Sequence, residues 1–259
     1  LIANPVHEGE AVIGAVIVLL DITEQEQREQ LRREFTANVS HELKTPLTSI
    51  SGYAELIENG MAKQEDIPTF GHRIHKEAQR MITLVSDILQ LSELDGMSKQ
   101  QENSPTADFV PVDLGVLVKD VATNMTVNAR KAYITLQYKV QPVTVRGSHD
   151  LLTELVTNLC DNAIRYNRPG GHVELSCGTN ADGCPYFCVE DNGIGIPQDS
   201  QSRVFERFYR VDKSRSKATG GTGLGLAIVK HIAVLHGARI DLESTVGTGT
   251  TIRIIFPKM

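Results

Sequence analysis

One long stretch of helix-forming residues, with a single apolar seam, constrains the fold more than any other feature of the sequence. From residue 22 to Gly60 the chain is charged and rich in strong helix formers, and only Pro46 and Gly52 interrupt it. Because apolar side chains recur there every three or four residues, the sequence predicts a long amphipathic helix. The seam consists of Phe35, Val39, Leu43, Pro46, Ile50, Tyr53 and Ile57.

A second helical run, from about residue 66 to residue 94, follows the turn "ENGMAKQEDIP" and carries a similar stripe. Two helices of this length form a hairpin whose apolar stripe is too large for the hairpin alone to cover. Dimerisation covers it at the least cost, so we expect an all-α helical hairpin that forms a dimeric four-helix bundle. The second stripe consists of Ile67, Phe70, Ile74, Met81, Val85 and Ile88.

His41 lies almost opposite the seam on a helical wheel, so its imidazole is expected to face solvent. Thr45 lies on the same outer side one turn later, and Pro46 is expected to bend the helix at this point. These positions alone fit either a reactive site or a solvated helix face that contains a histidine and a kink.

The segment "SKQQENSPTADF", residues 98–109, has the composition of a linker. Helix and strand signals then alternate over about 150 residues, with mostly hairpin-like connections. These connections favour a mixed sheet with helices on one face over a doubly wound parallel sheet. We expect helices near 113–130, 149–166 and 224–236, and strands near 133–139, 143–147, 171–178, 185–190, 238–244 and 250–256.

Within this α/β segment, the stretch "ELVTNLCDNAIRYN" predicts a helix with an apolar face and a polar column. Carboxylate and amide oxygens suit a hydrated Mg²⁺ ion, and a guanidinium suits the phosphates that such an ion bridges. A solvated helix face is the alternative interpretation. The column consists of Glu154, Asn158, Asp161, Asn162 and Arg165.

Two glycine-containing stretches complete the candidate site. In "VEDNGIGIP", Asp191 ends a strand and Gly193 and Gly195 allow close backbone approach, although a simple turn fits this pattern too. In "GGTGLGLAIVKHIAVLHG", a glycine-rich loop opens into a helix, where free amides attract phosphate. Leu226 stands where the dinucleotide fingerprint requires glycine, and no P-loop motif occurs, so Rossmann and P-loop interpretations lose support.

Composition excludes several other classes of protein. A net charge of −6 argues against a general nucleic-acid binder. The four cysteines lack C-x-x-C pairing and histidine partners at zinc spacing, which indicates reduced thiols in a reducing compartment. The longest apolar run, "AVIGAVIVLL", is too short to span a bilayer and suits a buried strand. With no initiator Met and no signal pattern, the chain has the character of an excised piece of a longer protein.

Five motifs, in this order, resemble those of bacterial sensor histidine kinases of two-component systems, in particular the PAS-linked PhoR and WalK type. "SHELKTPL" resembles the phosphoacceptor box, "NLCDNAIRY" the asparagine box, "DNGIGIP" the first glycine box, "FERFYR" the phenylalanine box and "GGTGLGLAIV" the second glycine box. The resemblance covers about residues 22–259. It implies a multidomain chain in which the helical hairpin precedes an α/β sandwich ATP-binding domain of the Bergerat fold.

The resemblance also implies domain boundaries. Residues 22–97 would form the dimerisation and histidine phosphotransfer hairpin, 98–109 a linker, and 110–259 the catalytic ATP-binding domain. Residues 1–21 resemble the end of a PAS domain running into a signalling helix, and a tail without structure is the alternative. Residues 197–220 resemble the mobile lid of the family.

Residue roles follow from the same resemblance. His41 would be the nucleophile toward the γ-phosphate and Glu42 the base, while Thr45 completes the family's E-x-x-T pattern. Asn158 would bind Mg²⁺ with support from Glu154, and Asp191 would accept a hydrogen bond from adenine. Arg165 stands where the family more often has lysine, which leaves its detailed role open. The implied ATP-binding set is Asn158, Asn162, Arg165, Tyr166, Asp191, Gly193, Gly195, Arg210, Lys213, Gly221, Thr222, Gly223, Leu224 and Gly225.

The implied activity is that of a protein histidine kinase, which phosphorylates His41 from ATP and passes the phosphoryl group to an aspartate of a response regulator, with phosphatase activity on that regulator. The implied partners are a second copy of the chain and the regulator's receiver domain, with no nucleic acid. The chain would be the cytoplasmic portion of a protein that segments upstream of it anchor in the membrane. A scaffold that binds ATP without turnover, and another Bergerat ATPase or serine kinase, remain alternatives.

Overall fold

The structure is a computed structural model, and it describes residues 2–9, 11–18, 21–101, 109–212 and 221–258. The chain divides into two compact units, Leu1–Phe70 and Gly71–Met259, each of which is described by itself. Within the described residues, no helix has the length and apolar content needed to span a membrane.

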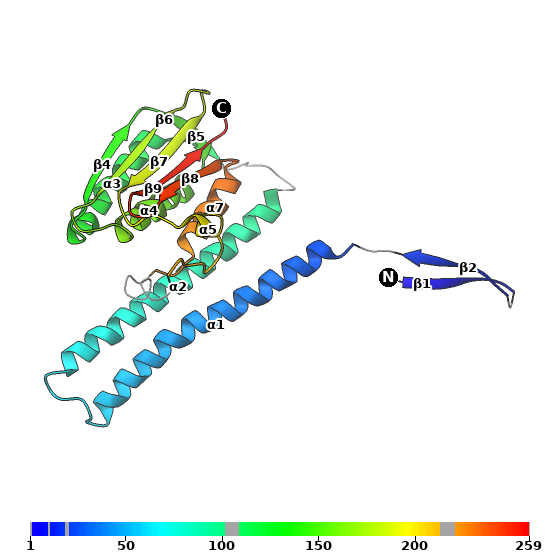
Figure 1. Ribbon diagram of the computed structural model, residues 1–259, viewed down its shortest axis with the longest axis horizontal. Coiled ribbons are helices and arrows are strands. Elements are labelled where there is room, and N and C mark those ends of the chain that lie inside the picture. Colours follow the sequence, from blue (N-terminus) through cyan, green and yellow to red (C-terminus); the bar gives the residue numbers. More distant parts are fainter. Residues whose placement is uncertain (1, 10, 19–20, 102–108, 213–220, 259) are drawn as a thin grey trace. The chain divides into compact units, whose positions relative to one another are not determined.

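The first unit begins with an antiparallel hairpin of β1 (Ile2–Glu8) and β2 (Ala11–Val18), shown in Figure 1. The apolar run that the sequence assigned to a buried strand does form β2. However, Ile13 is 61% exposed, so burial is wrong at this position. Within the described residues β1 and β2 pair only with each other, and a two-stranded sheet without a covering layer leaves outward side chains in solvent.

Helix α1 (Thr23–Glu58) follows, with the backbone N–H of Thr23 donating to Asp21 Oδ1 at 2.9 Å. Pro46 lies inside the helix. All seven residues of the predicted seam are half-buried or buried, whereas His41 and Thr45 are exposed. The helical period therefore predicted correctly which side of α1 is covered and which side faces solvent.

The turn after α1 is closed by local contacts. Gly60 adopts φ 65°, the left-handed conformation common after a helix, and the N–H of Met61 donates to the Leu56 carbonyl at 3.0 Å. The rings of Tyr53 and Phe70 lie 5.2 Å apart between centroids, which ties the end of α1 to the residues beyond the turn. The predicted turn thus separates two helices.

Helix α2 (Ile67–Gln101) lies mostly in the second unit. Its most buried apolar side chains are Leu84, Leu91 and Leu94, whereas Val85, which the predicted stripe included, is 44% exposed. The helix extends through the first residues of the segment that resembles a linker. Residues 102–108 of that segment lie outside the described residues, so the domain boundaries stay a prediction.

The α/β segment that follows α2 contains a five-stranded sheet in the order β4-β6-β7-β9-β8. Only β4 and β6 pair in parallel, so the predicted mixed sheet is confirmed. A separate pair joins β3 (Val110–Asp113) to β5 (Thr144–Gly147). The bounds of the five strands are β4 Thr135–Val140, β6 His172–Thr179, β7 Pro185–Asp191, β8 Arg239–Thr245 and β9 Gly249–Ile255.

Three helices, α3 (Leu114–Lys131), α4 (His149–Arg165) and α7 (Gly225–Leu235), cover one face of this sheet (Figure 1). The short helix α5 (Gln198–Gln201) contacts β8. The core lies between the helices and the sheet, where the largest fully buried side chains include Leu155, Leu175, Phe187 and Ile228. This packing turns one face of α4 toward the sheet and leaves its polar column outside the core.

His236 is a buried histidine with a structural role. Its Nδ1 lies 2.7 Å from the Ile232 carbonyl oxygen, and its Nε2 accepts the backbone N–H of Ser148 at 3.2 Å. A neutral ring with its proton on Nδ1 satisfies both contacts. Burial, the largest influence, lowers the pKa of His236 below its ordinary value.

We therefore expect the wild type to lose more stability on acidification than a His236→Leu variant. The unfolded chain binds a proton near pH 6.5 and the folded chain only at lower pH, so the neutral ring's contribution is complete above about pH 6.5 and disappears as pH falls through the folded pKa. At pH 7.5 the free energy of unfolding of the variant should be about 1–3 kcal/mol lower than that of the wild type, because the Ser148 N–H loses its acceptor. Urea unfolding at pH 7.5 and 5.5 measures both effects. The same pH dependence in both proteins would contradict the assignment.

Candidate functional site

The predicted phosphoacceptor residues lie together on α1. His41 and Thr45 are exposed and Glu42 is half-buried. The Thr45 hydroxyl donates to the His41 carbonyl oxygen at 3.2 Å, and Pro46 has no N–H to offer the Glu42 carbonyl one turn earlier. The imidazole of His41 is thus open to solvent on a helix whose backbone hydrogen bonding changes at the next turn.

The polar column predicted on α4 is present. Its five members are all half-buried, whereas Leu155, Val156 and Leu159 on the other side are buried against the sheet. Arg165 Nη2 donates to Asp161 Oδ2 at 2.6 Å, an ion pair one helical turn apart. The column presents carboxylate and amide oxygens, together with a guanidinium, at the edge of the core.

Glu154 has the most perturbed carboxyl group of the column. Burial is the largest cause that raises its pKa to about 7, the negative charge of Asp87 adds to the shift, and a hydrogen bond from Asn158 opposes it. A nearby cation would stabilise the ionised form of this carboxyl group, because the positive charge compensates the negative charge that burial disfavours.

The glycine-rich loop comes very close to the α4 column. A Cβ atom added at Gly221 would lie 3.2 Å from the Tyr166 hydroxyl and 3.3 Å from Arg165 Nη1. At Gly225 it would lie 3.0 Å from Asn158 Oδ1, and Gly223 adopts φ 77°. A side chain at Gly221 or Gly225 would crowd these groups, so glycine lets the loop backbone approach the column closely, an arrangement that suits phosphate binding by backbone amides.

Asp191 lies at the end of β7, where its Oδ1 accepts the backbone N–H of Gly193 at 2.8 Å. Burial raises the pKa of Asp191. The Ile194 N–H donates to the Tyr166 carbonyl at 3.1 Å, and a Cβ at Gly195 would lie 2.1 Å from the Thr245 carbonyl oxygen. Tyr166 therefore contacts the Asp191 turn through its backbone and approaches the glycine-rich loop through its hydroxyl.

The stretch that resembles the phenylalanine box is tied to the same loop. The N–H of Phe208 donates to the Gly223 carbonyl at 2.9 Å, and Phe208 adopts φ 62°, an uncommon value for a residue with a side chain. Arg210 is half-buried, and its Nη2 lies 3.6 Å from a Cβ built at Gly221. Leu224 is fully buried beneath the loop. Lys213 and the rest of the segment through residue 220 lie outside the described residues.

Sequence reasoning missed two residues of α2 that touch this site. Asp87 Oδ2 accepts the hydroxyl of Thr222 at 2.6 Å, and the side-chain amide of Gln90 donates to the Glu154 carboxylate. These partners are separated by 135 and 64 residues along the chain. No periodicity or motif connects positions so far apart, so the sequence held no signal for them.

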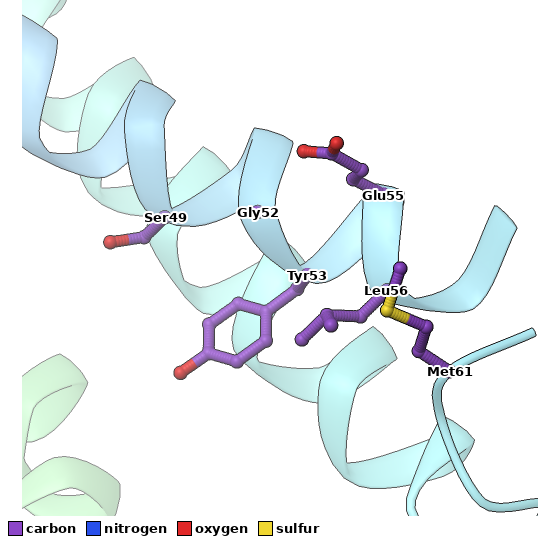
Figure 2. Close-up of a pocket in the computed structure, with 6 residues that line it drawn as sticks. All are labelled: Ser49, Gly52, Tyr53, Glu55, Leu56 and Met61. Atoms are coloured by element: carbon purple, nitrogen blue, oxygen red, sulfur yellow. The ribbon is translucent and has the colours of Figure 1, made fainter. Parts of the chain in front are cut away.

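The residues present fit a magnesium nucleotide. Asn158 and Glu154 offer the hard oxygen atoms that Mg²⁺ prefers, and Arg165 offers a planar donor for phosphate. A separate hollow of about 480 Å³ lies near the end of α1, where Tyr53, Leu56 and Met61 supply most of its apolar lining (Figure 2). This hollow contains none of the predicted site residues.

Two families of known domains match the chain. Residues 31–96 match the His Kinase A (phospho-acceptor) domain, and residues 147–259 match the histidine kinase-, DNA gyrase B- and HSP90-like ATPase. The first range contains His41, Glu42 and Thr45, and the second contains the α4 column and both glycine stretches. The matches therefore cover both groups of residues described above.

Individual proteins are similar to the chain as well. The sensor protein kinase WalK of Staphylococcus aureus is 40% identical over 258 residues, which are 97% of this chain and 60% of that protein. The chain spans 41% of a second WalK, from Staphylococcus saprophyticus, at the same identity. The solved mycobacterial sensor histidine kinase MprB is 31% identical with a TM-score of 0.50, and covers 57% of this chain and 97% of its own length.

A second solved structure, full-length ShkA in complex with AMPPNP, is 27% identical with a TM-score of 0.59. It covers 88% of this chain and 45% of its own length. A phospho-acceptor match thus precedes an ATPase match in this sequence, and the chain belongs to the family of sensor histidine kinases.

Proposed function

We propose that the chain is a kinase core that transfers the γ-phosphoryl group of ATP to His41 and then to an aspartate of a response regulator. The observation that carries the proposal is the solvent-exposed His41 on the helix that matches the phospho-acceptor domain, in the same chain as residues that fit a magnesium nucleotide. The curated relatives are sensor kinases, and a related structure holds the ATP analogue AMPPNP.

In the first step an imidazole nitrogen of His41 attacks the γ-phosphorus. A P–N bond forms as the bond to the β,γ-bridging oxygen breaks, and ADP leaves with that electron pair. Glu42 takes or holds the proton of the other ring nitrogen, which keeps the attacking nitrogen's lone pair free. In the second step the aspartate carboxylate of the regulator attacks phosphorus and returns the electron pair to His41.

The nucleotide residues divide between two ends of the site. Asp191 accepts from the adenine amine, while the glycine-rich loop and Arg210 contact the phosphates. Asn158, with Asn162 and Glu154 in support, holds Mg²⁺, which when bound neutralises phosphate charge. Arg165 orients the same phosphates through its fork of donors, and Tyr166 and Leu224 keep the loop against α4. Lys213 is proposed as a further phosphate contact on the family's pattern alone.

The proposal is tested by incubating the chain with γ-labelled ATP and exposing the labelled protein to acid or to alkali. Phosphohistidine is lost in acid and survives alkali, so this is the expected pattern. Label that resists acid would place the phosphoryl group on another residue type. Binding of ATP with no label at all would instead support a scaffold without turnover.

A homodimer is part of the proposal. Ile82, Val85 and Leu89 lie at helical spacing on α2, and each is at least 44% exposed. An apolar stripe of this kind is stable in water when another helix covers it, and a second copy supplies the same stripe in a four-helix bundle. The domain boundaries, the PAS origin of residues 1–21 and an upstream membrane anchor rest on the family alone.

Phosphatase activity on the regulator is assigned to Thr45. Its hydroxyl lies one turn from His41 on the exposed side of α1, where it orients a water for in-line attack on the phosphoaspartate. We expect Thr45→Ala to keep self-labelling within a few-fold of the wild type but to slow decay of the phosphorylated regulator by about tenfold or more.

The decay assay uses purified phosphorylated regulator with ADP and the kinase core. Thr48→Ala is the matched control, because the Thr48 hydroxyl also donates to a carbonyl of α1 and is exposed. Thr45→Ser should retain most of the activity. A decay rate that Thr45→Ala leaves unchanged would reduce Thr45 to a helix residue before a proline.

A further inference from the structure

Within the second unit, helix α2 presents two polar side chains to the nucleotide site and a third to a separate cluster. Asp87 accepts from Thr222 at 2.6 Å, Gln90 donates to Glu154, and Asp95 pairs with Arg207 at 2.6 Å and with His231 at 3.0 Å. These three residues lie at helical spacing among the buried leucines of α2, Leu84, Leu91 and Leu94. The contacts therefore belong to one side of the helix.

Asp87 interacts with groups that would also bind a nucleotide phosphate. Thr222 is a member of the glycine-rich loop, and its hydroxyl points to a carboxylate oxygen of Asp87. The positive charge of Arg165 also acts on Asp87 and lowers its pKa, against the larger upward effect of burial. A carboxylate thus occupies the hydrogen-bonding position at the Thr222 hydroxyl and lies within the electrostatic influence of the Arg165 guanidinium.

We propose that Asp87 is an internal stand-in for a nucleotide phosphate, held at Thr222 by α2 and displaced when ATP binds. This inference rests on the proposed function, since it assumes that Thr222 and Glu154 serve the nucleotide. Gln90 strengthens the competition, because the Glu154 carboxylate that accepts its amide is the one assigned to Mg²⁺.

Asp95 acts at a distance from the nucleotide residues. Its carboxylate oxygens accept from Arg207 Nη2 at 2.6 and 2.9 Å, and its Oδ1 lies 3.0 Å from His231 Nε2. All three side chains are partly exposed, so this cluster is worth little by itself and releases easily. Its role is to keep Asp87 and Gln90 in place until ligand binding outweighs the sum of the contacts.

The inference has a thermodynamic consequence. If part of the population holds Asp87 at Thr222 and only the rest accepts ATP, the apparent dissociation constant equals the intrinsic constant divided by the fraction that accepts ATP. Weakening the contacts of α2 must then tighten ATP binding. By reciprocity, ATP must weaken the contacts of α2.

The test measures the affinity of the full chain for MgATP by calorimetry. Asp87→Asn and Asp87→Ala should each bind about threefold to tenfold more tightly than the wild type. Glu93→Gln removes one charge from an exposed position on the same helix, and should change affinity by less than about twofold. Asp95→Asn should also tighten binding, because it acts only through the position of α2.

Several outcomes would overturn the inference. Equal affinity in all five proteins would show that Asp87 does not compete with nucleotide. Weaker binding by Asp87→Ala would mean that Asp87 contributes to nucleotide binding. Tighter binding by the Asp87 variants, with no effect of Asp95→Asn, would contradict a role for the position of α2.

Thermal melting followed by circular dichroism checks that each variant is folded. A wild type that bound no MgATP would contradict the proposed function as well, whereas normal binding that depends on Asn158 but not on Asp87 contradicts this inference alone.

Discussion

Replacing His41 with glutamine is expected to reduce self-labelling by γ-labelled ATP to background while the melting temperature stays nearly the same. Glutamine lacks the ring nitrogen whose lone pair forms the P–N bond, so the chemical step loses its acceptor. The side chain is exposed, and substitutions at such positions usually change unfolding free energy by less than about 0.5 kcal/mol. The substitution should therefore abolish self-labelling without a measurable change in melting temperature.

The matched control is His72→Gln, which removes another exposed histidine from a long helix. It should label like the wild type. Both variants should bind MgATP with wild-type affinity, which shows that a missing signal reflects the acceptor and not the nucleotide site. Equal labelling of the His41 variant and the wild type would move the phosphoryl group to a different residue.

Asn158→Ala is expected to weaken magnesium-dependent ATP binding by about tenfold or more, as losses of metal-site partners commonly do. The amide oxygen of Asn158 borders the space beneath Gly225, and without it the cation that neutralises the phosphates is held less firmly. The half-buried position on α4 tolerates alanine, a strong helix former, so the fold should persist.

Calorimetry with MgATP, repeated in excess EDTA, separates the metal contribution from the rest. Chelation should weaken binding strongly for the wild type and only slightly for the variant. Asn124→Ala, at an exposed position on α3, serves as the control and should match the wild type in both conditions. If Asn158→Ala keeps full affinity in the presence of magnesium, the ligand assignment is wrong.

Local patterns predicted most of the fold because they report on packing along a single element. The period from Phe35 to Ile57 located the covered side of α1, and the column from Glu154 to Arg165 located the polar side of α4. Both follow from one helix and one apolar layer. The strand β3 was missed because four residues with Pro111 carry too short a signal, and its pairing with β5 is a tertiary contact.

The contacts between distant positions could not be predicted. No sequence pattern predicts the contact between Asp87 and Thr222. Helix periodicity predicts which side of α2 carries Asp87, but it does not predict the residue that packs against that side. Burial was also misjudged where it depends on another layer, as at Ile13. Periodicity predicts that a face is apolar, whereas the neighbour that covers the face decides whether it is buried.

The backbone of Phe208 gives the glycine-rich loop a mechanical property. A bulky residue at φ 62° is strained by roughly 1–2 kcal/mol, and the bond from its N–H to the Gly223 carbonyl helps to hold it there. The strain at Phe208 is therefore coupled to the position of the loop. If a nucleotide draws Gly223 toward its phosphates, the hydrogen bond to Phe208 should break, and the backbone strain released at Phe208 should offset part of the free energy needed to move the loop.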